Sequence, residues 1–281
     1  MDEVLAVLDK WGEEARIVAG NTTLYELANQ GGLAGTRRLV DLEGAGLNYI
    51  RVDEQGTLHL GACTTFSEIA SSELLDGKSY FGIKEVSVKT TPPQIRNMGT
   101  IGGSACSGIP FYDIPVVLHA LRARMEILSL NSQRIIEGPD FFVDYFVTAL
   151  QPNEVLAEIQ VDSRPLAGSS FVKLGRSSVD FAVVNCSTFV SLDGNGRRVL
   201  EARISLGGVS NTPISYAAAE EYLVGKEASE ASVVAAATKP LDFEPMPSVH
   251  ASTAYKKRVI PVVVRDALLL ALERARQARP R

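Results

Sequence analysis

The sequence has 281 residues, a formal net charge of −5 and a pI near 5.4. Hydrophobic residues make up 46% and charged residues 22%, which is typical of a globular protein and excludes a largely disordered one. The acidic balance argues against nucleic acid as a partner, because phosphate binding needs a positively charged surface.

Length and local composition also limit the domain count and the location. A chain of 281 residues favours two domains over one or three. The first residues include Asp2 and Glu3, which have the wrong charge for the start of a signal peptide. No apolar run reaches the ~20 residues of a membrane helix. We therefore expect a cytoplasmic protein without a membrane span.

The first quarter of the chain alternates between helix and strand patterns. Val4–Trp11 has the apolar spacing of a helix. The β-type run Ala15–Ala19 ends at Gly20, which predicts strand, glycine turn and helix in that order. The elements expected next are a strand at Thr36–Leu42, a hairpin of Tyr49–Val52 with Thr57–Ala62, and a helix at Phe66–Ser72 with Thr64 or Thr65 as its cap.

The central part of the chain contains the densest signal in the sequence, Thr91–Ser104. Its prolines are followed by glycines, so we expect no regular helix there. After it, Ile114–Leu121 has an apolar helical pattern with Pro115 in the first turn, where a missing N–H costs nothing. The other elements expected here are a strand at Arg124–Ser129, a short helix or loop at Phe141–Val147, and a strand at Val155–Val161.

The C-terminal part reads as an antiparallel sheet backed by helices. Turn residues fill Arg164–Ser170, and we place the domain boundary there. Pro261 is expected to break or start the last helix. The strands expected are Phe171–Leu174, Ala182–Ser191 and Arg197–Gly207, and the helices are Tyr216–Leu223, Ala231–Thr238 and Tyr255–Ala278. These elements predict an α+β fold.

Cysteine and histidine spacing indicates no metal site. Cys63, Cys106 and Cys186 are far apart in the sequence and none belongs to a Cys-x-x-Cys pair, which excludes a self-contained zinc or iron–sulfur site. We interpret them as small buried residues. The three histidines are equally scattered, so core or surface positions are favoured over metal ligation.

Two glycine-containing turns carry the chemistry that the sequence suggests. Ile17–Leu24 and Thr100–Ser104 each expose successive backbone N–H groups beside hydroxyls, an arrangement that suits a pyrophosphate. A capped structural turn would look the same as the first of them. Neither segment fits the Gly-x-Gly-x-x-Gly fingerprint or the Gly-x-x-x-x-Gly-Lys-Ser/Thr phosphate loop, so Rossmann and nucleotide-triphosphatase folds are not supported.

Four features together resemble a known family. Ala19–Thr22, Gln94–Gly103, Asp113 and Leu206–Val209 are similar to segments of the medium, FAD-binding subunits of the xanthine dehydrogenase and carbon monoxide dehydrogenase family of molybdenum hydroxylases. The resemblance runs almost end to end. It implies a fold of the vanillyl-alcohol oxidase and p-cresol methylhydroxylase type. Residues 1–165 would form two α+β subdomains, divided near 50–60, and residues 166–281 a small three-stranded antiparallel sheet with helices.

The resemblance also implies roles for particular residues. The two turns would hold the FAD diphosphate and ribityl groups, and Asp113 would accept hydrogen bonds from sugar hydroxyls, its alternative role being a helix cap. Lys173 would lie close to the flavin, its alternative being an exposed strand lysine, and Thr90 replaces an aromatic residue of some relatives. The cofactor-binding residues expected are Ile17, Val18, Ala19, Gly20, Asn21, Thr22, Thr23, Leu24, Thr100, Ile101, Gly102, Gly103, Ser104, Asp113, Leu156 and Lys173.

The function implied is an electron relay. In the family, a molybdenum subunit oxidises the substrate, a small subunit with [2Fe–2S] clusters carries the electrons, and the flavin subunit passes them to NAD or another acceptor. The molybdopterin cofactor and the clusters would then lie on partner chains, in a dimer of heterotrimers. A stand-alone flavin oxidase or reductase and a flavin-free scaffold protein are the alternatives. No catalytic residue is assigned.

Overall fold

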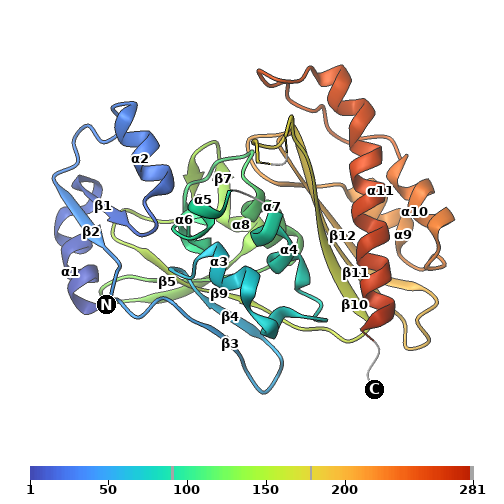
Figure 1. Ribbon diagram of the computed structural model, residues 1–281, viewed down its shortest axis with the longest axis horizontal. Helices are drawn as coiled ribbons and strands as arrows, with labels where there is room; N and C mark the ends of the chain where they lie inside the picture. Colours follow the sequence, from blue (N-terminus) through green and yellow to red (C-terminus); the bar gives the residue numbers. More distant parts are fainter. Residues whose placement is uncertain (90–91, 178, 279–281) are drawn as a thin grey trace.

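The computed structural model describes residues 1–89, 92–177 and 179–278. Figure 1 shows three parts in a row: an N-terminal part with α1 and α2, a central sheet with short helices above it, and a C-terminal sheet flanked by the long helix α11. The sheets have five strands in the centre and four in the C-terminal part, and the predicted α+β class is confirmed.

The N-terminal part is a small two-stranded parallel layer. Leu5 and Leu8 pack against Val40 in a core cluster of their own. The helix, strand and strand expected here are confirmed within a few residues. The elements are α1 (Asp2–Trp11), a 3₁₀ turn (Gly12–Glu14), β1 (Ala15–Val18), α2 (Thr22–Asn29) and β2 (Arg38–Asp41).

The central sheet is antiparallel throughout, with the strand order β3-β4-β9-β5-β6. Leu58 and Leu60 point to the apolar core on one face, whereas His59 between them points to a polar face. The expected hairpin is confirmed, with Ile50 paired to Leu60. The strands are β3 (Ile50–Val52), β4 (Leu58–Gly61), β5 (Arg124–Leu128), β6 (Gln133–Glu137) and β9 (Val155–Val161).

Short helices cover the apolar face of this sheet. Of the two caps that the sequence left open, Thr65 is the one that starts α3, and it forms a capping box with Glu68. The expectation that Thr91–Ser104 is free of helix is wrong: Pro93 occupies the first position of one short helix, and Thr100 caps the next. The helices are α3 (Phe66–Ser71), a 3₁₀ turn (Glu73–Leu75), α4 (Phe81–Lys89), α5 (Pro93–Arg96), α6 (Ile101–Cys106), α7 (Asp113–Ala120) and α8 (Gly138–Phe141). Where a short helix or loop was expected at Phe141–Val147, β7 (Phe142–Asp144) and β8 (Val147–Thr148) form a small hairpin.

The C-terminal sheet has the order β10-β11-β12-β13, one strand more than expected. The first strand begins at Ala167, inside the segment expected to be a turn. Pro261 lies within α11 and neither breaks nor starts it. The elements are β10 (Ala167–Leu174), β11 (Val184–Leu192), β12 (Val199–Gly207), β13 (Ile214–Ser215), α9 (Ala217–Leu223), α10 (Glu230–Ala237) and α11 (Thr253–Gln277). Because α11 covers one face and α4 with α7 the other, every residue of β11 is buried.

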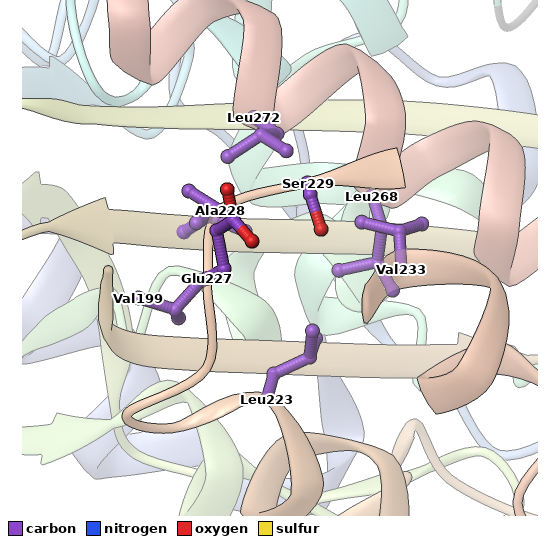
Figure 2. A pocket seen from close by; sticks show the side chains of 9 residues that line it. Val199, Leu223, Glu227, Ala228, Ser229, Val233, Leu268 and Leu272 are labelled. Atoms are coloured by element: carbon purple, nitrogen blue, oxygen red, sulfur yellow. The ribbon is translucent and has the colours of Figure 1, made fainter. Parts of the chain in front are cut away.

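Two cavities lie away from the predicted site residues. An apolar cavity of about 10 Å³ between β12, α9, α10 and α11 has room for little more than one water molecule (Figure 2). A second hollow, of about 310 Å³, lies at the surface between the β3–β4 turn and the Ser163–Pro165 linker. Among the described residues, no helix has the length and apolar character that crossing a membrane requires.

Candidate functional site

The first predicted turn lies against Met98 and Gly99, which directly precede the second predicted turn. A Cβ atom added to Gly20 would stand 1.8 Å from the carbonyl oxygen of Met98 and 3.0 Å from the Cα of Gly99. The backbone that follows β1 therefore rests directly on the loop between α5 and α6. Only glycine permits this approach, and the need here is for space, since Gly20 does not have a positive φ.

The first turn ends in a helix start that no side chain caps. Asn21 is in the left-handed region, with φ 57°, and its carbonyl accepts the first intrahelical bond, from Tyr25. The N–H groups of Thr22, Thr23 and Leu24 precede that bond, and α2 has no side-chain cap among the described residues. Asn21 is exposed and the three residues after it are partly exposed. Uncapped N–H groups at the positive end of a helix attract an anion.

The second turn differs from the prediction, because the N–H groups of residues 101–104 already have partners. Ile101 donates to the carbonyl of Thr64, and Gly102 donates to that of Ala62. Gly103 and Ser104 donate to the side-chain and backbone oxygens of Thr100. The expectation that this turn exposes successive N–H groups is therefore wrong for residues 101–104. Gly102 serves packing instead, since its Cβ would lie 2.5 Å from the Cβ of Ala62, whereas Gly103 is exposed.

Asp113 and Lys173, predicted as separate contacts to the cofactor, form a buried ion pair. Lys173 Nζ donates to Asp113 Oδ2 at 2.9 Å, and the two side chains are 7% and 5% exposed. Asn185 Nδ2 donates to the other carboxylate oxygen at 2.7 Å. The alternative role of each residue is wrong. Asp113 was considered as a helix cap, but it is the first residue inside α7 and does not cap it. Lys173 was considered as an exposed strand lysine, but it is buried.

Tyr112 connects this ion pair to the first turn. Its hydroxyl lies 3.1 Å from Thr23 Oγ1, and its ring stacks on that of Phe181, with Phe111 at the edge of both. Burial raises the pKa of the Tyr112 hydroxyl, and the hydrogen bond with Thr23 opposes that rise. The hydroxyl therefore stays protonated at neutral pH. Helix α2 and the start of α7 are thus joined by one side-chain hydrogen bond.

The remaining predicted residues lie around this centre. Ile17 and Val18 are in β1, partly buried, and lead into the turn at Ala19. Leu156 is in β9, which packs against α6, and the residue is only 2% exposed in the central core. Thr90 lies outside the residues that the structure describes.

Two residues of this arrangement were missed in the sequence. Tyr112 directly precedes Asp113, and its role depends on a contact with Thr23, 89 positions away. Asn185 left a usable signal, because it is a polar residue inside the apolar run Ala182–Cys186. A buried amide in such a run must find hydrogen-bond partners, and these are the usual reason for its presence.

The cysteines and histidines do not form a site. In the part of the chain that the structure describes, no group of His, Cys, Asp or Glu side chains could hold a metal ion. Burial raises the pKa of the thiols of Cys63, to about 11, and Cys106, to about 12, and that of Cys186 still further. Burial also lowers the pKa of His119 to about 4, which keeps this ring neutral.

The donor set suits a nucleotide cofactor with a diphosphate. The uncapped start of α2 supplies backbone N–H groups, and the hydroxyls of Thr22 and Thr23 stand beside them. The Asp113 carboxylate can accept from sugar hydroxyls, because a carboxylate has about four acceptor positions. Lys173 adds a positive charge within the same hydrogen-bonded group. These residues fit FAD, and the first turn offers the backbone N–H groups that a diphosphate needs.

Family comparison agrees with this donor set. Residues 1–163 match the family model of the "FAD binding domain in molybdopterin dehydrogenase". Residues 169–271 match that of the "CO dehydrogenase flavoprotein C-terminal domain". Together the two matches account for nearly the whole chain, in the order expected.

Individual relatives give the same result. The chain is 33% identical to the "6-hydroxypseudooxynicotine dehydrogenase complex subunit alpha" of Paenarthrobacter nicotinovorans, over 98% of this chain and 93% of that one. It is 31% identical to the carbon monoxide dehydrogenase medium chain of Afipia carboxidovorans, over 98% of this chain and 94% of that one.

A structure of carbon monoxide dehydrogenase from Hydrogenophaga pseudoflava aligns with a TM-score of 0.89 at 29% identity, covering 97% of this chain and 94% of that one. Quinoline 2-oxidoreductase from Pseudomonas putida aligns with a TM-score of 0.88 at 27% identity, covering 98% and 95%. These alignments confirm the fold that the sequence resemblance implied. The chain therefore belongs to the family of FAD-binding medium subunits of molybdenum hydroxylases, which are components of oxidoreductase complexes.

Proposed function

We propose that the chain takes electrons from the [2Fe–2S] clusters of a small partner chain and passes them to NAD or another acceptor. A large partner chain would hold the molybdopterin cofactor, and the assembly would be a dimer of heterotrimers. The relatives support this proposal, since they are named as a subunit of a dehydrogenase complex and as medium chains. The bound flavin supplies the redox chemistry, and this chain supplies binding and electrostatics.

The observation that carries the proposal is the uncapped start of α2 at a turn packed on a second loop. The Gly20–Met98 contact fixes where α2 begins, and so fixes the direction of the N–H groups of Thr22, Thr23 and Leu24. Fixed donors bind a diphosphate without an ordering cost. In this proposal α6 contributes position and shape, and its internally bonded amides stay with their present partners.

The Asp113–Lys173 pair extends the site beyond the diphosphate. Its carboxylate would accept from the sugar or ribityl hydroxyls of FAD, and its ammonium would favour negative charge on the reduced flavin. Both groups are buried, so the field that they produce is screened less than it would be at the surface. The pair would thereby tune how readily the flavin accepts electrons.

Co-purification tests the proposal. The full chain, expressed with the chains encoded beside it, should yield a yellow complex that contains FAD, iron and molybdenum. Addition of the substrate of the complex should bleach the flavin absorbance only when the iron–sulfur chain is present. A chain that carries FAD and is reduced by substrate on its own would instead be a stand-alone oxidase. A complex without flavin absorbance would contradict the proposal.

A further inference from the structure

Asn185 is the only polar residue between Ala182 and Cys186 of the described chain, and it lies next to the ion pair of the site. Within the C-terminal sheet it is paired with Lys173 on one side and with Gly207 on the other. Its side chain is fully buried. The Nδ2 group donates to Asp113 Oδ1 at 2.7 Å and to the carbonyl of Tyr112 at 3.3 Å.

The orientation of this amide is determined by its neighbour. An ionised carboxylate only accepts, so the NH₂ group of Asn185 must face Asp113. The Oδ1 atom then points at Gly207, and among the described residues it has no hydrogen-bond partner. A Cβ on Gly207 would stand 2.3 Å from this oxygen. Within the part of the chain that the structure describes, Asn185 directs two N–H bonds at the Tyr112–Asp113 segment while its own oxygen is left without a partner. An apolar side chain would have avoided that cost.

We propose that Asn185 is a positioning residue, which fixes the Asp113 carboxylate and the Tyr112–Asp113 peptide in the geometry that binds FAD. This inference rests on the proposed function, because it assigns Asp113 to the cofactor. Asn185 lies outside the turns that would hold FAD and acts through Asp113. Its second bond, to the carbonyl of Tyr112, holds the residue whose hydroxyl contacts Thr23 in the first turn.

Replacement by aspartate separates positioning from packing. Asn185→Asp keeps the shape and places a second carboxylate at hydrogen-bond distance from Asp113. The charged groups at this position are Asp113 from α7, which accepts from Asn185, and Lys173 from β10, which pairs with Asp113. The neighbouring titratable groups Tyr112 and Cys186 are neutral, because burial raises the pKa of both. From α11, Lys256 donates to the carbonyl of Gly208, next to Gly207. Two carboxylates beside one ammonium share a proton at low pH and repel each other at high pH.

The experiment measures the dissociation constant of FAD for the full chain, purified with its partner chains, from about pH 5.5 to about pH 8.5. At about pH 8.5, Asn185→Asp should bind FAD at least about tenfold more weakly than the wild type. At about pH 5.5, its dissociation constant should lie within about threefold of the wild-type value. Asn185→Leu should bind weakly at every pH. Asn195→Asp, the same charge change on the exposed turn after β11, should follow the wild type.

Each outcome decides one question. The positioning role would be overturned if the FAD affinity of Asn185→Asp, relative to the wild type, did not change with pH. It would also be overturned if Asn185→Leu bound FAD normally. Recovery of Asn185→Asp at low pH itself shows that this variant is folded, so a misfolded leucine variant does not prevent the test. A wild-type complex that binds no FAD at any pH would instead refute the proposed function, and the inference with it.

Discussion

At the scale of single residues, the site depends on the absence of a side chain at Gly20 and on an unusual backbone angle at Asn21. Glycine permits both close approach and positive φ, but here the two features fall on successive residues. Asparagine tolerates the left-handed region better than most residues. The sequence therefore predicted a tight turn with exposed N–H groups. It could not predict that the close approach falls on Gly20 and the left-handed backbone angle on Asn21.

The pairing of Asp113 with Lys173 shows the same limit. Each residue was identified as a cofactor contact, yet the two lie 60 positions apart and meet only when α7 packs against the C-terminal sheet. Local patterns report helix and strand periods and carry no information on such a contact. Asn185 was missed for this reason, although a polar residue in an apolar strand should prompt a search for its partner.

Gly20→Ala tests the contact between the turns. The added methyl group would stand 1.8 Å from the carbonyl oxygen of Met98, and because this obstacle is backbone, the start of α2 must move. We expect FAD to bind at least about tenfold more weakly, since a loss of ~1.4 kcal/mol of binding energy already has this effect. Flavin fluorescence during titration of the complex measures it. Gly194→Ala, where a Cβ meets nothing within 4 Å, should bind normally; equal binding by the two variants would contradict this account.

At the scale of elements, the predicted helices and strands are those with a regular apolar pattern. Helix α4 was missed because its buried residues include Gly82, Glu85 and Ser87, which hide the helical period. Strand β6 was missed because it lies at a sheet edge with mainly polar residues, and β13 because it has only two residues. The expected division into residues 1–165 and 166–281 stays a prediction.

The polar face of the central sheet carries a network that centres on Glu158 of β9. Burial alone would raise the pKa of this carboxyl group, but hydrogen bonds from four side chains outweigh burial and hold the pKa at about 2. Glu158 is only 3% exposed, so these bonds replace its contact with water. The donors are His59, Tyr49, Gln160 and Arg51.

Acid titration of unfolding tests the network. Because the pKa of Glu158 is lower in the folded chain than the ordinary 4.5, its stabilisation is fully present above about pH 4.5 and is lost as the pH falls toward 2. Glu158→Gln should lower the unfolding free energy near neutral pH by about 1–3 kcal/mol and reduce its dependence on pH in that window. Urea unfolding at several pH values measures both. Glu54→Gln, on the exposed turn of the β3–β4 hairpin, should change neither; a Glu158 variant with the wild-type pH slope would show that the network stabilises little.

At the scale of the whole molecule, the C-terminal sheet joins the helix that ends the chain to the helices of the central part. Helix α11 lies so close to β10 that a Cβ on Gly168 would stand 2.4 Å from the carbonyl oxygen of Ala271. Helix α4 also packs against β10, and Glu85 of α4 accepts from the backbone N–H of Phe171 at the open edge of this strand. The sheet that carries Lys173 and Asn185 is therefore held from both sides.

Arg274 of α11 and Glu85 of α4 make the most direct link across this arrangement. The guanidinium donates to both carboxylate oxygens, at 2.7 and 3.0 Å, donates to the carbonyl of Ser169, and lies over the ring of Phe81. Burial would raise the pKa of Glu85, but the bonds from Arg274 and Lys89 lower it overall. Glu85 is thus ionised and nearly buried, and it depends on its partners for that charge.

Arg274→Ala should therefore loosen α11 from the rest of the molecule. Removing one partner of a buried pair typically costs about 3–5 kcal/mol. Because Lys89 still pairs with Glu85 in this variant, we expect a cost near the lower end of that range. Amide hydrogen exchange in the last turns of α11 and in β10 should become about a hundredfold faster or more, since ~2.8 kcal/mol corresponds to that factor.

Arg265→Ala provides the control, because Arg265 lies on the same helix and pairs only with its neighbour Asp266 among the contacts described. Equal exchange rates in the two variants would mean that apolar packing alone holds α11 on the sheet. Faster exchange confined to Arg274→Ala, together with weaker FAD binding, would show that the ion pair also keeps Lys173 and Asn185 in register with Asp113.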